Sequence, residues 1–265
     1  MIDTHTHLYM TDSFPDGGKA AVGRAKDAGV EMMVLPAVDR ESVRPMIALH
    51  QDFPDNTFLA MGLHPTEVET SWREELKEIT DSVDSEDITA IGETGIDLYW
   101  DKSNLHRQMD AFGEQIQMAI ERNLPVIVHS RDALKETIEV INGFSSRRPV
   151  FVFHSFTAGR DEAEKLLEAA PEAFFGINGV VTFKNAEPLR EAVRHLDESR
   201  IVTETDAPFL APVPFRGKTN ESSYIPYIVK AIADAKGVTE DYVARLTHEN
   251  ALRLFPKLRI HPNLT

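Results

Sequence analysis

The sequence predicts an α/β fold, a (β/α)₈ TIM barrel, and two observations lead to it. Eight short apolar segments recur along the 265 residues, with starts that lie 24–37 residues apart. Amphipathic segments of helical length separate them, which is typical of parallel strands joined by helices. A barrel of this length is commonly one domain, so we predict a single domain over residues 1–265.

Each predicted strand is a short apolar run bounded by turn residues. In chain order the strands are expected at residues 1–5, 31–37, 57–63, 88–93, 125–129, 149–154, 174–178 and 200–206. Their apolar side chains would fill the barrel or pack under the surrounding helices.

The predicted helices have one apolar face. In segment 104–124, Leu105, Met109, Phe112 and Ile116 recur at three- and four-residue steps. Further helices are expected at 17–28, 40–51, 71–82, 131–142, 159–170, 186–196, 223–236 and 239–253. An open, doubly wound sheet is the alternative fold, but the chain has no glycine-rich phosphate loop to favour it.

Composition excludes several classes of protein. The chain has no cysteine, which rules out structural disulfides, cysteine-based zinc fingers and thiol catalysis. It has no basic and apolar leader and no apolar run of about 20 residues, so we expect a cytoplasmic protein without a membrane partner. The net charge of −15 argues against broad attraction to a polyanion, although a local site remains compatible with it.

Metal-binding residue types concentrate at the predicted strand ends, where barrel enzymes carry their active sites. Five of the ten histidines lie there, as do two acids. These residues are His5, His7, His64, Glu93, His129, His154 and Asp206. Asp3, His5 and His7 also alternate, so they would share one face of the first strand. A single histidine after a strand is usually structural, but this many donors on one rim favour a metal site.

The number of donors exceeds what one catalytic metal needs. Two metals bridged by Glu93 would use all of them. Imidazole and carboxylate ligands suit Zn²⁺ or Mn²⁺, or Mg²⁺ with more oxygen ligands. We therefore predict two divalent ions and leave their identity open among Mg²⁺, Mn²⁺ and Zn²⁺.

Seven motifs occupy these strand ends and the loops that follow them. They are DTHTH, GLHPTEV, IGETGID, VIVHSRDA, FHSFTAG, INGVVTFKNA and TETDAPFLAPVPFRGKTNE. Together, and in this order, they resemble the TatD family of metal-dependent hydrolases, a branch of the amidohydrolase-like barrels. The resemblance runs from residue 2 to about residue 255.

The resemblance implies a role for each candidate residue. His5 and His7 would bind one metal, Glu93 would bridge to a second, and His129 and His154 would hold that second metal. Asp206 would ligate the first metal and accept the proton of the attacking water, so Asp206 and Glu93 are the expected catalytic residues. Asp3 and Glu204 are expected to support the ligands from behind.

Three further residues are candidates for binding a substrate phosphate: His64, Arg131 and Arg216. Arginine can meet phosphate through a bidentate fork. A salt bridge that caps the next helix is an equally good interpretation of Arg131, and His64 could instead shape the turn before Pro65. Tyr99 and Trp100 are the best candidates for stacking a base.

These features predict a metal-dependent phosphodiesterase, most simply a deoxyribonuclease acting on DNA ends or single strands. Its partner would be DNA or a small phosphoester, with no obligate protein partner. The alternative is a hydrolase of amides, esters or aminoacyl-tRNA esters on the same metals. A non-catalytic metal-binding scaffold is the third hypothesis, and the intact ligand set speaks against it.

Overall fold

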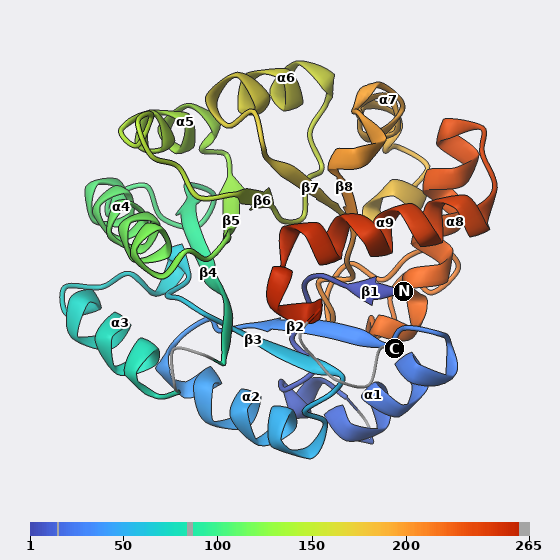
Figure 1. Ribbon diagram of the computed structural model, residues 1–265, viewed down its shortest axis with the longest axis horizontal. Helices are drawn as coiled ribbons and strands as arrows, with labels where there is room; N and C mark the ends of the chain where they lie inside the picture. Colours follow the sequence, from blue (N-terminus) through green and yellow to red (C-terminus); the bar gives the residue numbers. More distant parts are fainter. Residues whose placement is uncertain (15, 84–86, 260–265) are drawn as a thin grey trace.

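The computed structural model describes residues 1–14, 16–83 and 87–259, which form a parallel β-barrel ringed by helices (Figure 1). Its strands are β1 (Ile2–Asp3), β2 (Met32–Pro36), β3 (Thr57–Met61), β4 (Ile88–Asp97), β5 (Val126–Arg131), β6 (Phe151–Phe153), β7 (Phe174–Ile177) and β8 (Ile201–Thr203). Each strand pairs in parallel with the next, in the order β1 to β8. The predicted (β/α)₈ barrel is confirmed, and the doubly wound alternative is wrong because the strand order never reverses.

The first and last strands nearly close the barrel. The Thr4 backbone N–H donates to Thr203 O at 3.0 Å, and the His7 N–H donates to Ala207 O at 2.7 Å. The Asp206 N–H donates in turn to His5 O at 2.9 Å. This seam joins the segments that follow β1 and β8, and it places His5, His7 and Asp206 side by side.

Every predicted helical segment contains most or all of an observed helix. The helices are α1 (Gly18–Asp27), α2 (Arg40–Asp52), α3 (Trp72–Asp81), α4 (Leu105–Arg122), α5 (Leu134–Asn142), α6 (Arg160–Ala169), α7 (Glu187–His195), α8 (Ile225–Lys236) and α9 (Glu240–Leu254). Capping fixes some ends: Asp39 and Ser42 form a capping box at the start of α2. Within the described ranges, no helix is long and apolar enough to cross a membrane.

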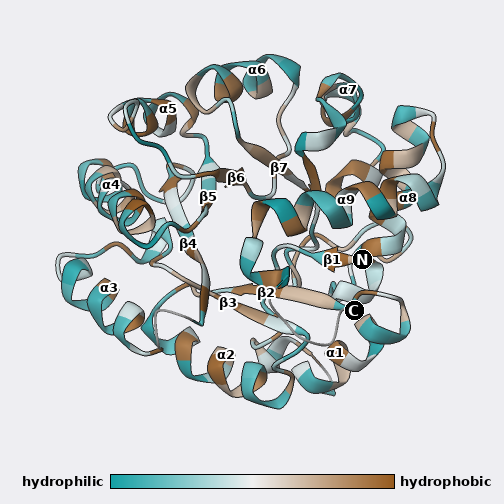
Figure 2. Ribbon diagram, in the orientation of Figure 1, coloured by the Kyte–Doolittle hydropathy of each residue, from teal (hydrophilic) through white to brown (hydrophobic). Residues whose placement is uncertain are grey.

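Alternating strand residues build two layers of core. On β2, Met32 and Val34 belong to the cluster inside the barrel, whereas Met33 and Leu35 belong to the larger cluster packed under the helices. Figure 2 shows the result: apolar strands at the centre and helices that are hydrophilic on their outer side.

Helix α9 and the 3₁₀ turn η6 (Pro256–Arg259) cover the N-terminal end of the barrel, which faces the viewer in Figure 1. The Asn250 amide donates to Ile201 O at the start of β8. Leu254, Phe255 and Leu258 join the cluster inside the barrel. The polar strand ends lie at the opposite end.

Candidate metal centre

Glu93 lies at the centre of the polar cluster. The sequence predicted Glu93 at the end of this strand, but β4 continues to Asp97, so Glu93 lies within it. Its Oε2 atom lies 3.2 Å from His5 Nε2 and 3.7 Å from His7 Nε2. Its Oε1 atom lies 2.9 Å from His154 Nε2 and 3.0 Å from His129 Nδ1. The two oxygens of one buried carboxylate thus face two different pairs of imidazoles.

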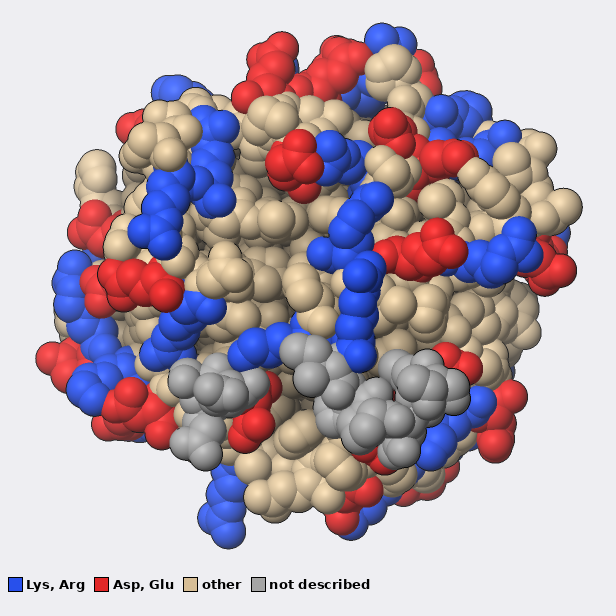
Figure 3. All heavy atoms as spheres, viewed as in Figure 1, with Lys and Arg blue, Asp and Glu red and all other residues tan. Residues whose placement is uncertain are grey.

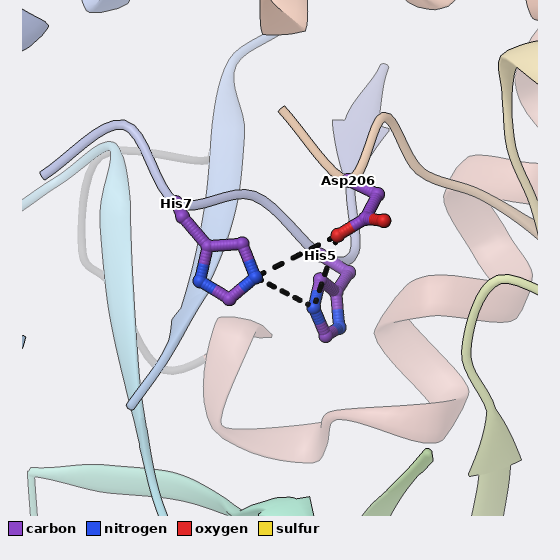
Figure 4. A group of neighbouring side chains, drawn as sticks. All are labelled: His5, His7 and Asp206. Carbon is purple, nitrogen blue, oxygen red and sulfur yellow. Dashed lines mark hydrogen bonds and ion pairs between the residues drawn. The ribbon is translucent and has the colours of Figure 1, made fainter. Parts of the chain in front are cut away.

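The first group consists of His5, His7 and Asp206 (Figure 4). The two Nε2 atoms lie 3.2 Å apart. Asp206 Oδ1 lies 3.8 Å from His5 Nε2 and 3.6 Å from His7 Nε2. Two neutral imidazole nitrogens at this separation can share at most one proton, whereas a cation between them would satisfy both lone pairs. The donor set therefore fits a divalent metal.

A hydrogen-bond chain assigns the proton on His7. The Tyr9 hydroxyl donates to Pro36 O at 2.6 Å, so it accepts a hydrogen bond from His7 Nδ1 at 2.8 Å. The Nδ1 atom then carries the ring proton, which leaves a lone pair on Nε2. That lone pair points toward His5 and Asp206, as a metal ligand requires.

The second group lies on the other side of Glu93. His154 stacks on His5 with ring centroids 3.7 Å apart and an interplanar angle of 14°. His64 Nε2 lies 3.5 Å from Glu93 Oε1, and its ring lies 4.5 Å from that of His129. His64, Glu93 and His129 each offer a ligand atom within one small volume, as do His5, Glu93 and His154.

Asp97 is a functional candidate that the sequence analysis missed. Its Oδ2 atom lies 2.9 Å from His129 Nε2 and fixes the orientation of that ring. Burial lowers the pKa of His129, but hydrogen bonds to Asp97 and Glu93 outweigh burial and raise it. The sequence did contain an indication of Asp97: it is the second acid of the IGETGID motif, four residues after Glu93.

Electrostatics favour charged carboxylates at this centre. Burial opposes ionisation of Glu93, yet the nearby imidazoles of His154, His5 and His64 hold its pKa well below the usual value. Burial opposes ionisation of Asp206 as well, and the nearby imidazoles, with His7 first among them, lower its pKa below the usual value. Both groups are therefore anionic at neutral pH.

Asp3 and Glu204 lie behind the imidazoles. Asp3 accepts hydrogen bonds from the Thr205 backbone N–H and hydroxyl, across the seam between β1 and β8. Burial raises the pKa of Asp3 to about 7. Glu204 accepts from the Ser155 N–H and lies 3.4 Å from His154 Nδ1. Gly176 makes room for it, because a Cβ there would lie 2.0 Å from Glu204 Oε2.

Arg131 and Arg216, the two arginines predicted to bind a substrate phosphate, each lie over an aromatic ring. The Arg131 guanidinium carbon is 3.8 Å from the centroid of the Tyr99 ring and 5.8 Å from that of Trp100. Arg216 is 3.7 Å from the Phe183 centroid. Arg131 forms no ion pair among the described residues, so the helix-capping salt bridge is not observed. It lines a cavity of about 610 Å³ that also reaches His154.

Comparisons with known proteins show which proteins this chain is similar to. Residues 2–256 match the family model described as TatD related DNase. The chain is 36% identical over 255 residues to an uncharacterized metal-dependent hydrolase, YabD, of Bacillus subtilis, covering 96% of this chain and 98% of that protein. It is 32% identical over 261 residues to the 3'-5' ssDNA/RNA exonuclease TatD of Pectobacterium carotovorum, covering 96% and 99%.

A solved structure with a similar fold is that of YJJV, a TatD homolog from Escherichia coli. The two structures superimpose with a TM-score of 0.86 at 27% sequence identity. The match covers 97% of this chain and 98% of that one.

Proposed function

The chain belongs to the TatD family of metal-dependent hydrolases that act on ester bonds, and from this premise we propose that it is a deoxyribonuclease. It would cleave phosphodiester bonds at DNA ends or in single strands. The observation that carries the proposal is the position of Glu93, whose two oxygens face two groups of imidazoles.

Each ligand has a role in this proposal. His5, His7 and Asp206 would hold one divalent ion, His129 and His154 would hold the other, and Glu93 would be a ligand to both. Bound there, two divalent ions would lower the pKa of a shared water and neutralise charge on the scissile phosphate. Asp206 lies among the imidazoles with a lowered pKa, so it is anionic and able to take the proton of that water.

Substrate contacts come from the rim. Arg131 lines the cavity beside His154, where its guanidinium group can bind a phosphate oxygen. Tyr99 and Trp100 are 54% and 70% exposed beside it, so an unpaired base can stack on them. Arg216, whose guanidinium group lies over the Phe183 ring, would contact the DNA substrate further from the metal centre. His64, at 3.5 Å from Glu93, would contact either the phosphate or the second ion.

The name of the relative from Pectobacterium carotovorum, a 3'-5' ssDNA/RNA exonuclease, supports nucleic acid as the substrate. An acyl substrate is the alternative on the same metals, since water activated in this way also attacks esters and amides. We propose one catalytic domain for the whole chain. The cytoplasmic location stays a prediction.

One substrate panel separates these functions. Chelator-stripped protein is supplied with Mg²⁺, Mn²⁺ or Zn²⁺ and given end-labelled single-stranded DNA, the matching RNA, duplex DNA and an aminoacyl ester. We expect metal-dependent shortening of the single-stranded DNA. Hydrolysis of the ester with intact DNA would move the assignment to acyl chemistry.

A further inference from the structure

A second cavity lies at the opposite end of the barrel from Glu93. Its volume is about 230 Å³. Arg147 and Arg148 reach it from the loop between α5 and β6, and Arg253 reaches it from α9. Its remaining walls are largely apolar, with Ile120 and Leu254 among them. Figure 3 shows this face, with Lys and Arg side chains gathered across its middle.

Within residues 1–14, 16–83 and 87–259, no acidic side chain forms an ion pair with the arginines of this cavity. Neither Arg147 nor Arg148 has a carboxylate within ion-pair distance in the part of the chain that the structure describes, and no described acid lines the cavity. The Nε atom of Arg148 has no hydrogen-bond partner among the same residues. An anion bound in the cavity would supply acceptors for the guanidinium donors that face it.

The guanidinium groups of Arg147 and Arg253 are each positioned by a hydrogen bond to a backbone carbonyl. Arg147 donates to Ile120 O at the end of α4, at 3.3 Å. Arg253 donates to Ser199 O and lies 5.2 Å from the centroid of the Phe174 ring. These contacts use only part of the five donors on each guanidinium. The remaining donors are positioned before any ligand arrives, which lowers the entropy lost on binding.

We propose that this cavity binds a phosphate group. Three arginines on one cavity match the charge and fork geometry of phosphate. The phosphate would come from a free nucleotide or from a nucleic acid strand that extends out of the cavity. This site is separate from the candidate metal centre and does not depend on the proposed function.

The test is a binding measurement on the full chain with its metals in place. Inorganic phosphate, deoxyadenosine monophosphate and a cleavage-resistant phosphorothioate DNA strand are titrated separately into wild type and an Arg147→Gln/Arg148→Gln variant. We expect the variant to bind about one phosphate fewer per chain, or to bind that phosphate at least about tenfold more weakly. Weaker binding of the strand as well would identify nucleic acid as the source, and an effect on the small ligands alone would identify a free nucleotide.

The matched control is Arg40→Gln/Arg73→Gln, which removes the same charge from two exposed arginines that pair with Glu78 and Glu114. It should bind all three ligands like wild type. If the variant does not fold, phenylglyoxal labelling of wild type provides the test, since phosphate should protect Arg147 and Arg148 from modification. Equal phosphate binding by wild type and variant, or absence of protection, would overturn the proposal.

Discussion

Glu93 has both carboxylate oxygens directed at imidazole nitrogens, and this sets the first prediction at the scale of residues. Glu93→Gln keeps the shape of the side chain but replaces one anionic oxygen with an amide nitrogen, which cannot ligate a cation. We expect the metal content of the purified protein to fall by at least one ion per chain. Mutation of a residue that only hydrogen-bonds to a metal ligand lowers metal affinity about 10–100-fold. Mutation of Glu93, which would itself be a ligand, should have at least this effect.

Elemental analysis after equilibrium dialysis measures that effect. Glu162→Gln is the control, because Glu162 lines the neighbouring cavity without contacting Glu93. A Glu93→Gln protein with the metal content of wild type would remove Glu93 as the bridge.

Arg131 gives a second prediction. Its guanidinium group lies on Tyr99 and lacks an ion-pair partner among the described residues, so it is available to a substrate phosphate. Arg131→Ala should raise KM for the DNA strand about tenfold with little change in kcat, since one charge-assisted hydrogen bond is lost from substrate binding. Arg131→Lys should recover part of the loss. An unchanged KM in steady-state assays would make Arg131 a structural residue.

The sequence pointed to the candidate ligands more readily than to the residues that hold them. His5, His129 and His154 could be selected because they come at the ends of predicted apolar strands, where barrels carry their active sites, and the structure brings them together around Glu93. Asp97 and Tyr9 were missed because they act through another side chain, and that contact depends on rotamers and strand register. Asp97 also lies beyond the expected end of β4, which stays paired with β5 to the level of Arg131.

At the scale of elements, strands were predictable where both faces are buried. The apolar runs of β2 and β3 mark them clearly: β2 is one residue shorter at each end than predicted, and β3 ends two residues earlier. β1 and β8 are shorter than predicted because Thr4–His7 and Glu204–Ala207 pair irregularly across the seam. Helix α5 begins later than predicted, at Leu134, because β5 continues to Arg131.

The seam itself gives a stability prediction. Buried Asp3 accepts hydrogen bonds from the Thr205 N–H and hydroxyl and from the His5 N–H. Asp3→Ala leaves these donors without an acceptor, so the free energy of unfolding should fall by about 2–4 kcal/mol. Urea unfolding of the metal-stripped protein measures it, and Asp3→Asn, which keeps one acceptor, should lose less. Equal stability of Asp3→Ala and wild type would contradict this role for the seam.

At the scale of the whole molecule, the net charge of −15 limits how a polyanion can be held. If Arg131 and Arg216 make the phosphate contacts at the rim, cleavage of a short single strand should weaken only modestly with salt. Two contacts correspond to a slope of about −1.4 for log kcat/KM against log salt concentration. A slope steeper than about −3 would require many more contacts than the rim provides.

The central step of the proposed hydrolysis is the deprotonation by Asp206 of a water activated at the metal centre. The most direct measurement is the rate at which Asp206→Asn shortens end-labelled single-stranded DNA, with its metal content determined on the same sample. We predict a rate about 10³-fold below wild type while at least part of the metal stays bound. Cleavage at the wild-type rate by metal-loaded Asp206→Asn would contradict the mechanism.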